Sequence, residues 1–283
     1  MDHRSEPAAD APTAQRRVFV VSDGTGITAE TLAHTLLTQF DGLAFSHTTL
    51  PFIDSVDKAR ATVEYINHVA ATDGARPLVF STTVADPIRN TLRGVHGLFI
   101  DLFDVMIPSL ERELARGSTH AQGRAHGVAD PGRYSERIAA MNFAMEHDDG
   151  ASTRDLQRAE VILIAPSRCG KTPTALYLAL QYSVFACNFP LTEEELAECA
   201  LPQSLRGLLP KLFGLMSEPE RLAQVRGERR PGSRYASLEQ CAWELRQAEA
   251  LYRRLNLPFV VSANKSIEEI AARVLQVTGL RRT

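Results

Sequence analysis

Cysteines are few in this sequence, and their spacing excludes two common kinds of cysteine-based site. Only four occur in 283 residues, with no CxxC pair and no histidine at the short offset that would complete a zinc site. A chain of this length can bury a core without a disulfide framework. We therefore expect reduced thiols and a cytoplasmic protein. The four are Cys169, Cys187, Cys199 and Cys241.

Long hydrophobic runs and an excess of charge are also missing. No apolar stretch approaches the roughly 18 residues that a membrane-spanning helix needs, so we expect no membrane partner. The 31 basic and 34 acidic residues give a net charge of -3, which argues against nucleic-acid binding driven by overall charge. Residues 1–16 are polar and lack the apolar segment of a secretory signal, so we predict a disordered tail there.

Along the rest of the chain, predicted strands alternate with predicted helices. The apolar runs 18–21 and 161–164 each predict a buried strand, and each leads into a glycine-containing loop and a helix. This order is typical of βαβ units in a parallel sheet. We therefore predict an α/β fold with two lobes, an N-terminal lobe at 17–150 and a nucleotide-binding lobe of P-loop kinase type at 151–283.

The remaining elements are predicted from the same patterns. Further strands are expected at 45–50, 77–83, 98–102, 183–189 and 258–262, and helices at 27–37, 54–71, 86–94, 134–146, 173–181 and 266–277. The segment 117–132 is rich in glycine, histidine and serine. We expect a mobile loop or a domain connection there.

The strongest functional signal is the loop between the strand at 161–164 and the helix at 173–181. It approximates the phosphate-binding pattern GxxxxGK[ST] in the expected strand-loop-helix context. Its last three residues match, whereas alanine occupies the first position, where a left-handed backbone would be strained. The eight residues are Ala165, Pro166, Ser167, Arg168, Cys169, Gly170, Lys171 and Thr172.

Each residue type in this loop suits a bound polyphosphate. Gly170 lets backbone N–H groups approach phosphate oxygens, and the following helix start attracts negative charge. Lys171 supplies a compact cation, Thr172 a hydroxyl ligand for Mg²⁺, and Arg168 a forked donor. The alternative is a chance Gly-Lys-Thr at a helix start with a solvated lysine.

Two other groups of residues carry possible chemistry. His147, Asp148 and Asp149 end a predicted helix near the loop, and a carboxylate there would accept a hydroxyl proton or hold Mg²⁺. The alternative is a polar helix end capped at Gly150. Five arginines form a basic cluster that we expect in a flexible loop, either closing over phosphates or simply solvated. They are Arg221, Arg226, Arg229, Arg230 and Arg234.

The loop Ser22 to Gly26 is a weaker candidate. It is either an anion-binding turn at the first helix or a tight turn whose glycines serve geometry, and it lacks the GxGxxG dinucleotide pattern.

Several of these strings together resemble a known family. The sequence is similar to the bacterial and plant regulatory proteins of phosphoenolpyruvate synthase and of pyruvate, phosphate dikinase, over residues Val18 to Leu280. The run Ser167 to Thr174 is the most specific part of the resemblance. The other strings are Val20 to Gly26, His147 to Gly150 and Leu176 to Ala179.

The resemblance implies a bifunctional enzyme. Such an enzyme phosphorylates a threonine of its target with ADP as donor, and removes that phosphate with inorganic phosphate, releasing pyrophosphate. Phosphoenolpyruvate synthase is the expected protein partner, and the dikinase is the alternative. The loop 165–172 would bind ADP. The resemblance leaves a homodimer open.

We assign roles within this expected reaction as a hypothesis. Lys171 and Arg168 hold the β-phosphate, Thr172 and Asp149 hold Mg²⁺, and Asp148 accepts the threonine proton beside His147. Two other functions compete with this one. A small-molecule kinase would use the arginine cluster as a lid, and a nucleotide-sensing module would bind ADP without transfer.

Overall fold

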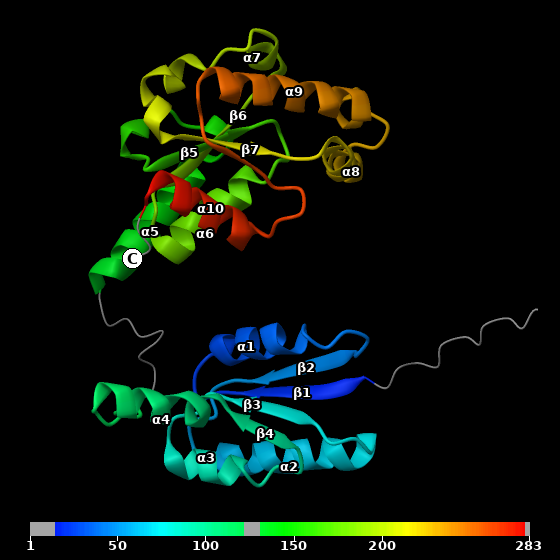
Figure 1. Cartoon of the computed structure of the whole chain (residues 1–283), viewed down its shortest axis with the longest axis vertical. Coiled ribbons are helices and arrows are strands. Elements are labelled where there is room, and N and C mark those ends of the chain that lie inside the picture. The colour runs from blue at the N-terminus through cyan, green and yellow to red at the C-terminus, as the bar shows by residue number, and fades with distance from the viewer. Residues whose placement is uncertain (1–14, 122–130, 281–283) are drawn as a thin grey trace, which may run out of the picture. The chain divides into compact units, whose positions relative to one another are not determined.

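The chain forms two α/β units, seen in a computed structural model (Figure 1) that describes residues 15–121 and 131–280. The division falls between Gly127 and Val128. The predicted tail at 1–16 and loop at 117–132 therefore lie largely outside the described residues. Helix α5 (Pro131–Glu146) packs on α6 (Lys171–Tyr182) of the second unit, although we had expected the lobe boundary only after residue 150.

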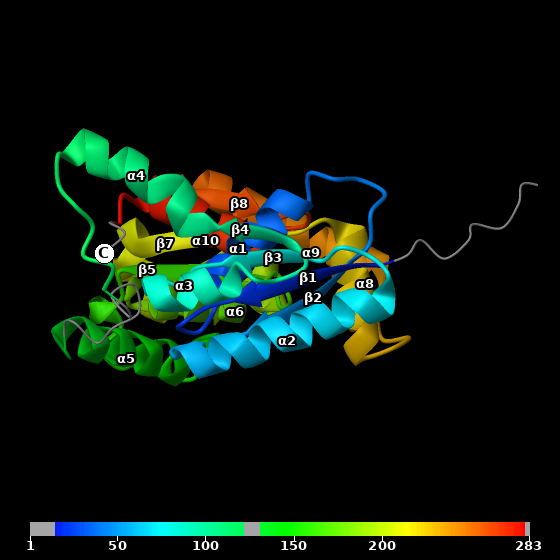
Figure 2. The same cartoon turned by 90° about the horizontal axis from the view of Figure 1, so that it is seen from below.

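The N-terminal unit contains a parallel four-stranded sheet in the order β2-β1-β3-β4. Strand β1 alternates: Phe19 and Val21 join the core under α2 and α3, whereas Val18 and Val20 join the core under α1. Figures 1 and 2 show these helices on the two faces of the sheet. The elements are β1 (Arg16–Val21), α1 (Ile27–Leu37), β2 (Phe45–Leu50), α2 (Val56–Asp73), β3 (Leu78–Ser81), α3 (Asp86–Leu92), β4 (Leu98–Asp101) and α4 (Leu102–Leu114).

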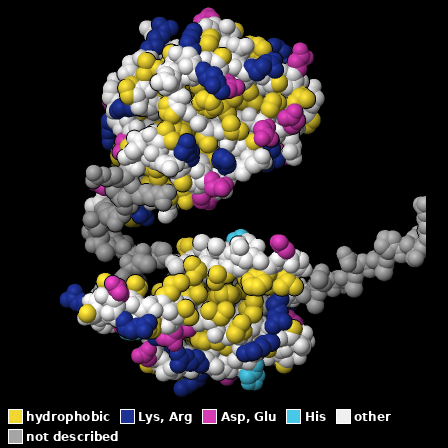
Figure 3. All heavy atoms as spheres, in the orientation of Figure 1, with side chains coloured by type: hydrophobic (Ala, Val, Ile, Leu, Met, Phe, Trp, Pro, Cys, Tyr) yellow, Lys and Arg dark blue, Asp and Glu magenta, His cyan; other side chains and the backbone are white. Residues whose placement is uncertain are grey.

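One face of this sheet is covered incompletely. Helix α1 packs over it, and a hollow of about 520 Å³ remains beside the helix, lined by residues such as Leu36, Phe40 and Leu98. Figure 3 shows the hydrophobic side chains that gather on this unit. Phe40 and Leu43 are more than half exposed there.

The C-terminal unit repeats the same strand order, β6-β5-β7-β8, again with parallel pairing. Helices α5, α6 and α10 lie on one side of the sheet, and α8 and α9 on the other (Figure 1). The predicted α/β fold with two βαβ lobes is therefore confirmed. The further elements are β5 (Val161–Ala165), β6 (Ala186–Pro190), α7 (Glu193–Ala197), β7 (Leu212–Met216), α8 (Pro219–Arg229), α9 (Leu238–Arg254), β8 (Phe259–Val261) and α10 (Ile267–Thr278).

Four of these elements were not predicted: β7, α7, α8 and α9. Strand β7 contains Gly214, which weakens a strand pattern. The glycine is required because a Cβ there would lie 2.6 Å from the ring of Tyr252. Helix α8 carries Arg221, Arg226 and Arg229, so the expectation of a flexible arginine loop is wrong for this part of the cluster.

None of the helices in the described ranges 15–121 and 131–280 is long and apolar enough to cross a membrane.

In the N-terminal unit, one buried arginine ties three acidic side chains together. Arg89 donates from Nε to Asp101 at 2.8 Å and from a terminal nitrogen to Asp86 at 3.2 Å, and it also pairs with Asp104. Asp101 in turn caps α4 by accepting from two backbone N–H groups. Since Arg89 and Asp101 are both buried, removal of one leaves the other charge without its partner.

We predict that Arg89→Ala lowers the free energy of unfolding of the N-terminal unit by about 3 kcal/mol. Denaturation followed by circular dichroism should detect this loss. The chain's single tryptophan, Trp243, lies in the other unit, so its fluorescence follows the unfolding of that unit separately. The control Arg93→Ala removes a half-exposed partner of Asp104 and should change stability by less than about 1 kcal/mol. Equal effects of the two substitutions would contradict the prediction.

Candidate active site

The predicted phosphate loop connects the central strand β5 to the start of α6. Ala165 is the last residue of β5 and pairs with Pro190 of β6, so alanine at the first loop position is in strand conformation. The turn is made further along, where Arg168 (φ 72°) and Gly170 (φ 86°) both adopt left-handed backbone conformations. Ala165 therefore avoids the left-handed conformation that would be strained for alanine, and Arg168 adopts it instead.

Lys171 folds back over the loop rather than pointing into solvent. It is 4% exposed, its Nζ donates to the carbonyl of Pro166 at 3.3 Å, and it lies 3.7 Å from Asp149 Oδ1. Burial lowers the pKa of the Lys171 ammonium from its ordinary value, and the Asp149 carboxylate opposes this shift. The solvated lysine of the alternative interpretation is therefore not what the structure contains.

The two aspartates occupy different surroundings. Asp148 Oδ1 accepts from the Thr172 hydroxyl and from the Asn188 side-chain amide, both at 2.7 Å. Asn188 is fully buried on β6, and its carbonyl oxygen accepts from the Asp149 backbone N–H at 3.1 Å. Asp148 is thus fixed beside the phosphate loop. The Asp149 side chain is 62% exposed and lines the adjoining pocket.

The turn after the aspartates requires glycine. Gly150 has φ +71°, and a Cβ there would approach the ring of Phe189 to 2.9 Å. Together with Asp149 (φ 49°), it reverses the chain after α5, which places both carboxylates at the loop.

His147 does not reach the loop. Its ring is buried and stacked on Phe143, with Nδ1 2.8 Å from the Phe143 carbonyl and Nε2 2.6 Å from the Arg154 carbonyl. Both ring nitrogens are therefore occupied by backbone oxygens. The imidazole holds the turn after α5 in place, and the geometry gives no support to the catalytic role that we expected.

A pocket of about 260 Å³ opens over the loop. Arg168 is exposed at its rim, and Arg229 reaches it from the last turn of α8. The basic side chains face the acidic Asp149 across a space that would accommodate phosphate groups. The lining residues are Asp149, Ser167, Arg168, Gly170, Lys171, Thr172, Pro173, Val225 and Arg229.

Sequence reasoning missed the part played by Arg226, which is completely buried. Its Nε and one terminal nitrogen donate to the Ser167 carbonyl at 3.3 and 3.0 Å, and its two terminal nitrogens pair with the two carboxylate oxygens of Glu244. The guanidinium also stacks on Tyr235, 4.2 Å from the ring centroid. The only sequence signal was its position four residues after buried Leu222, on the core-facing side of α8.

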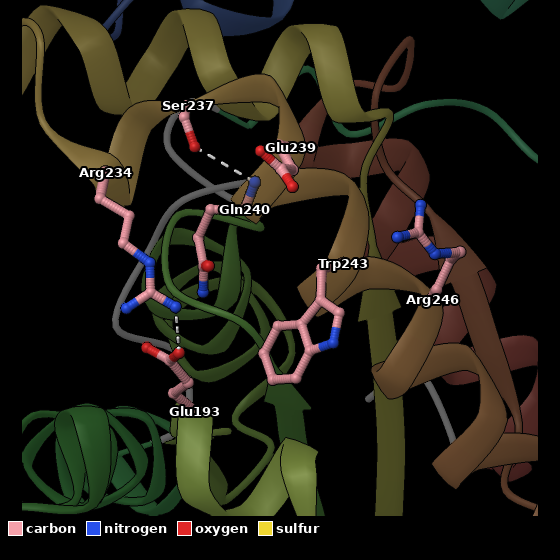
Figure 4. A pocket seen from close by; sticks show the side chains of 7 residues that line it. All are labelled: Glu193, Arg234, Ser237, Glu239, Gln240, Trp243 and Arg246. Atoms are coloured by element: carbon pink, nitrogen blue, oxygen red, sulfur yellow. Dashed lines mark hydrogen bonds and ion pairs between the residues drawn. The ribbon is translucent and has the colours of Figure 1, made fainter.

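The remaining arginines of the cluster lie in different surroundings. Arg221 donates to Gln224 on the exposed side of α8. Arg234 pairs with Glu193 of α7 at 2.6 Å, in the separate hollow that contains Trp243 (Figure 4). Arg230 lines a third hollow with Ser167, Arg229 and Tyr235. The five arginines therefore do not form one cluster. Arg226 lies in the core and Arg221 on the exposed side of α8, whereas the other three line three different hollows.

Two further sites can be assessed from the geometry. In the described part of the chain, no three His, Cys, Asp or Glu side chains could hold a metal ion together. The Thr172 hydroxyl and Asp148 fit Mg²⁺ only as partial ligands, with phosphate and water oxygens completing the shell. In the turn Ser22 to Gly26, the Ser22 hydroxyl accepts from Gly24 N–H and from Thr82, which fits the tight-turn interpretation.

Comparison with known proteins gives consistent matches over nearly the whole chain. A protein of Legionella pneumophila (strain Paris), provisionally named a phosphoenolpyruvate synthase regulatory protein, is 50% identical over 268 residues, which cover 95% of this chain and 99% of that protein. Proteins of the same name from Pseudomonas fluorescens (strain Pf0-1) and Pseudomonas aeruginosa (strain LESB58) are 48% and 47% identical over 268 residues. Each match covers 95% of this chain and 98% of the relative.

A family model described as kinase/pyrophosphorylase matches residues 18–275, which include both units and the phosphate loop. The resemblance found in the sequence strings is therefore confirmed, and the chain belongs to the kinase/pyrophosphorylase family.

Proposed function

We propose that this protein transfers the β-phosphoryl group of ADP to a threonine of phosphoenolpyruvate synthase, and removes it again by phosphorolysis. Family membership supports the pair of activities, and the names of the relatives support the target. The observation that carries the chemistry is the phosphate loop, with Lys171 and Asp149 facing one pocket.

In the forward direction, the loop would hold the phosphates of ADP. Backbone N–H groups at the start of α6 would donate to the phosphates. The space beside Gly170 is open, because a Cβ there would meet no atom within 4 Å. Lys171 would exchange its contacts with Pro166 and Asp149 for phosphate oxygens, and Arg168 and Arg229 would neutralise further charge.

The surroundings of the two aspartates favour roles opposite to those predicted from sequence. A general base needs a free oxygen within reach of the reacting hydroxyl. Asp148 Oδ1 already accepts two hydrogen bonds, whereas Asp149 lines the pocket. We therefore assign Asp149 as the acceptor of the threonine proton. Asp148 and Thr172 would hold Mg²⁺, which when bound would neutralise charge on the phosphate oxygens.

Phosphorylation and phosphorolysis each form one bond to the transferred phosphorus and break one. In phosphorylation, the threonine oxygen attacks the β-phosphorus, its proton passes to Asp149, and the bond to the bridging oxygen breaks to release AMP. In phosphorolysis, an oxygen of inorganic phosphate attacks the phosphothreonine phosphorus. The threonine oxygen leaves and takes a proton that solvent supplies through the exposed Asp149, and pyrophosphate is the other product. One charged pocket stabilises the transferred group both times.

We predict that Lys171→Ala lowers both activities by at least about 100-fold, because it removes the buried cation at the phosphates. The assay incubates the protein with phosphoenolpyruvate synthase and ADP labelled in the β-phosphate. Label should appear on a synthase threonine and leave as pyrophosphate when phosphate is added. The control Lys211→Ala changes a lysine whose Nζ donates to the Gln157 carbonyl and which lines no part of the phosphate-loop pocket, and it should behave as wild type.

Either of two results would contradict this proposal. Retention of one activity by Lys171→Ala would exclude a shared site. Labelling of pyruvate, phosphate dikinase in place of the synthase would keep the chemistry and change the target.

We predict that the two aspartates separate in a kinetic comparison. Asp149→Asn should lower kcat about 100-fold or more without weakening ADP binding, because it removes the proton acceptor and also a negative charge beside Lys171. Asp148→Asn should instead raise the Mg²⁺ concentration that gives half-maximal rate. Titration of Mg²⁺ and calorimetric ADP binding measure these quantities, and an exchange of the two effects would restore the roles first assigned from sequence.

We predict that Cys169→Ala leaves both activities unchanged. Burial raises the pKa of the Cys169 thiol to about 12, and the side chain is 2% exposed in the hydrophobic core. The residue thus contributes its backbone to the loop and no thiolate at neutral pH. The same labelling assay tests this, and a large loss of rate in a variant of unchanged melting temperature would assign the thiol a chemical role.

A further inference from the structure

A second hollow of about 220 Å³ adjoins the phosphate-loop pocket. Its lining residues are Ser167, Arg229, Arg230 and Tyr235. Ser167 and Arg229 also line the first pocket, so the two spaces share a wall. Asp149, Lys171 and Thr172 line only the first pocket. The two hollows are therefore neighbouring but chemically different.

The second hollow is basic, with no acidic residue in its lining. Arg229 and Arg230 are exposed, and within the described residues neither makes an ion pair with a carboxylate. By contrast, Figure 4 shows Arg234 of the same segment directed toward Glu193, with which it pairs. Two guanidinium groups without carboxylate partners, beside a tyrosine hydroxyl and a serine hydroxyl, suit a phosphate anion.

The walls of this hollow are held rigidly against the loop. The Tyr235 hydroxyl lies 3.0 Å from Ser167 Oγ, and Arg226 donates both to the Ser167 carbonyl and to the Tyr235 carbonyl. Arg226 is itself fixed by its two bonds to Glu244. A buried, fully bonded guanidinium therefore sets the spacing between the phosphate loop and the segment that carries Arg230.

We propose that this second hollow binds the phosphate that is not transferred. It would take the α-phosphate of ADP in phosphorylation and inorganic phosphate in phosphorolysis. This inference rests on the proposed function, because both reactions need a phosphate anion next to the transferred group. In an in-line displacement the threonine oxygen and this second phosphate lie on either side of the phosphorus. Asp149 would exchange the proton of the threonine oxygen, and Arg229 and Arg230 would bind the second phosphate.

The shared subsite has a direct consequence for inhibition. AMP places its phosphate where inorganic phosphate must bind, so AMP should inhibit phosphorolysis competitively with phosphate. Pyrophosphate spans both hollows and should bind more tightly than inorganic phosphate alone. Both effects depend on Arg230, which lines the second hollow but not the first.

Calorimetry tests the subsite without any turnover. Wild-type protein should bind pyrophosphate more tightly than inorganic phosphate. Arg230→Gln should weaken pyrophosphate binding about 10-fold or more, because a charge-assisted hydrogen bond is lost. The matched control is Arg221→Gln, which removes the same charge from the same segment but lines neither hollow and bonds Gln224. It should bind pyrophosphate as wild type does.

The kinetic arm uses phosphorylated synthase as substrate. Arg230→Gln should raise the KM for inorganic phosphate about 10-fold and weaken inhibition by AMP, with a smaller change in kcat. Equal affinity of wild type for phosphate and pyrophosphate, or wild-type behaviour of Arg230→Gln, would overturn the subsite even if label transfer from ADP is observed. Absence of label transfer with the expected calorimetry would instead overturn the proposed function and leave the second anion site standing.

Discussion

The buried guanidinium of Arg226 is the contact on which the geometry of the active site depends. A charge with no exposure is tolerated only when its donors are bonded, and all three nitrogens of Arg226 have acceptors. These acceptors belong to three segments, the phosphate loop through Ser167, the turn at Tyr235, and α9 through Glu244. The loop conformation is therefore not a local property of eight residues. It is held from outside by a helix that begins about fifty residues later.

The same strand order and the same turn geometry occur in both units. Gly26 and Gly170 both precede a helix in the left-handed conformation, with φ 84° and 86°, after the central strand of a parallel sheet. The residues that follow differ. Ile27 and Thr28 follow the first glycine, whereas Lys171 and Thr172 follow the second and lie beside a pair of aspartates. The shared geometry offers backbone donors in both units, and the buried cation and carboxylates confine the proposed transfer chemistry to the second.

The phosphate loop, its flanking elements and the nearby aspartates were predictable because each depends on short-range patterns. The different surroundings of the two aspartates were not predictable, because they depend on Asn188, which lies on β6 forty residues further along. The orientation of His147 was equally hidden, since a histidine beside two aspartates resembles a catalytic group until its carbonyl partners are seen. For α8, the high density of arginine concealed one buried position among exposed ones. A run of charged residues in a sequence does not show which of them is buried, because burial depends on tertiary packing.

Two neighbouring carboxylates have different surroundings here, because hydrogen bonds fix one and the backbone turns the other outward. The Asp148 carboxylate accepts hydrogen bonds from Thr172 and Asn188, which fix its position beside the phosphate loop. Asp149 has a left-handed backbone conformation and is followed by Gly150, and its exposed carboxylate lines the pocket. In the proposed reactions, Asp149 would accept the threonine proton during phosphorylation and donate a proton to the same oxygen during phosphorolysis. On this proposal, which of the two reactions proceeds would depend on which phosphate compound fills the pocket and its basic neighbour.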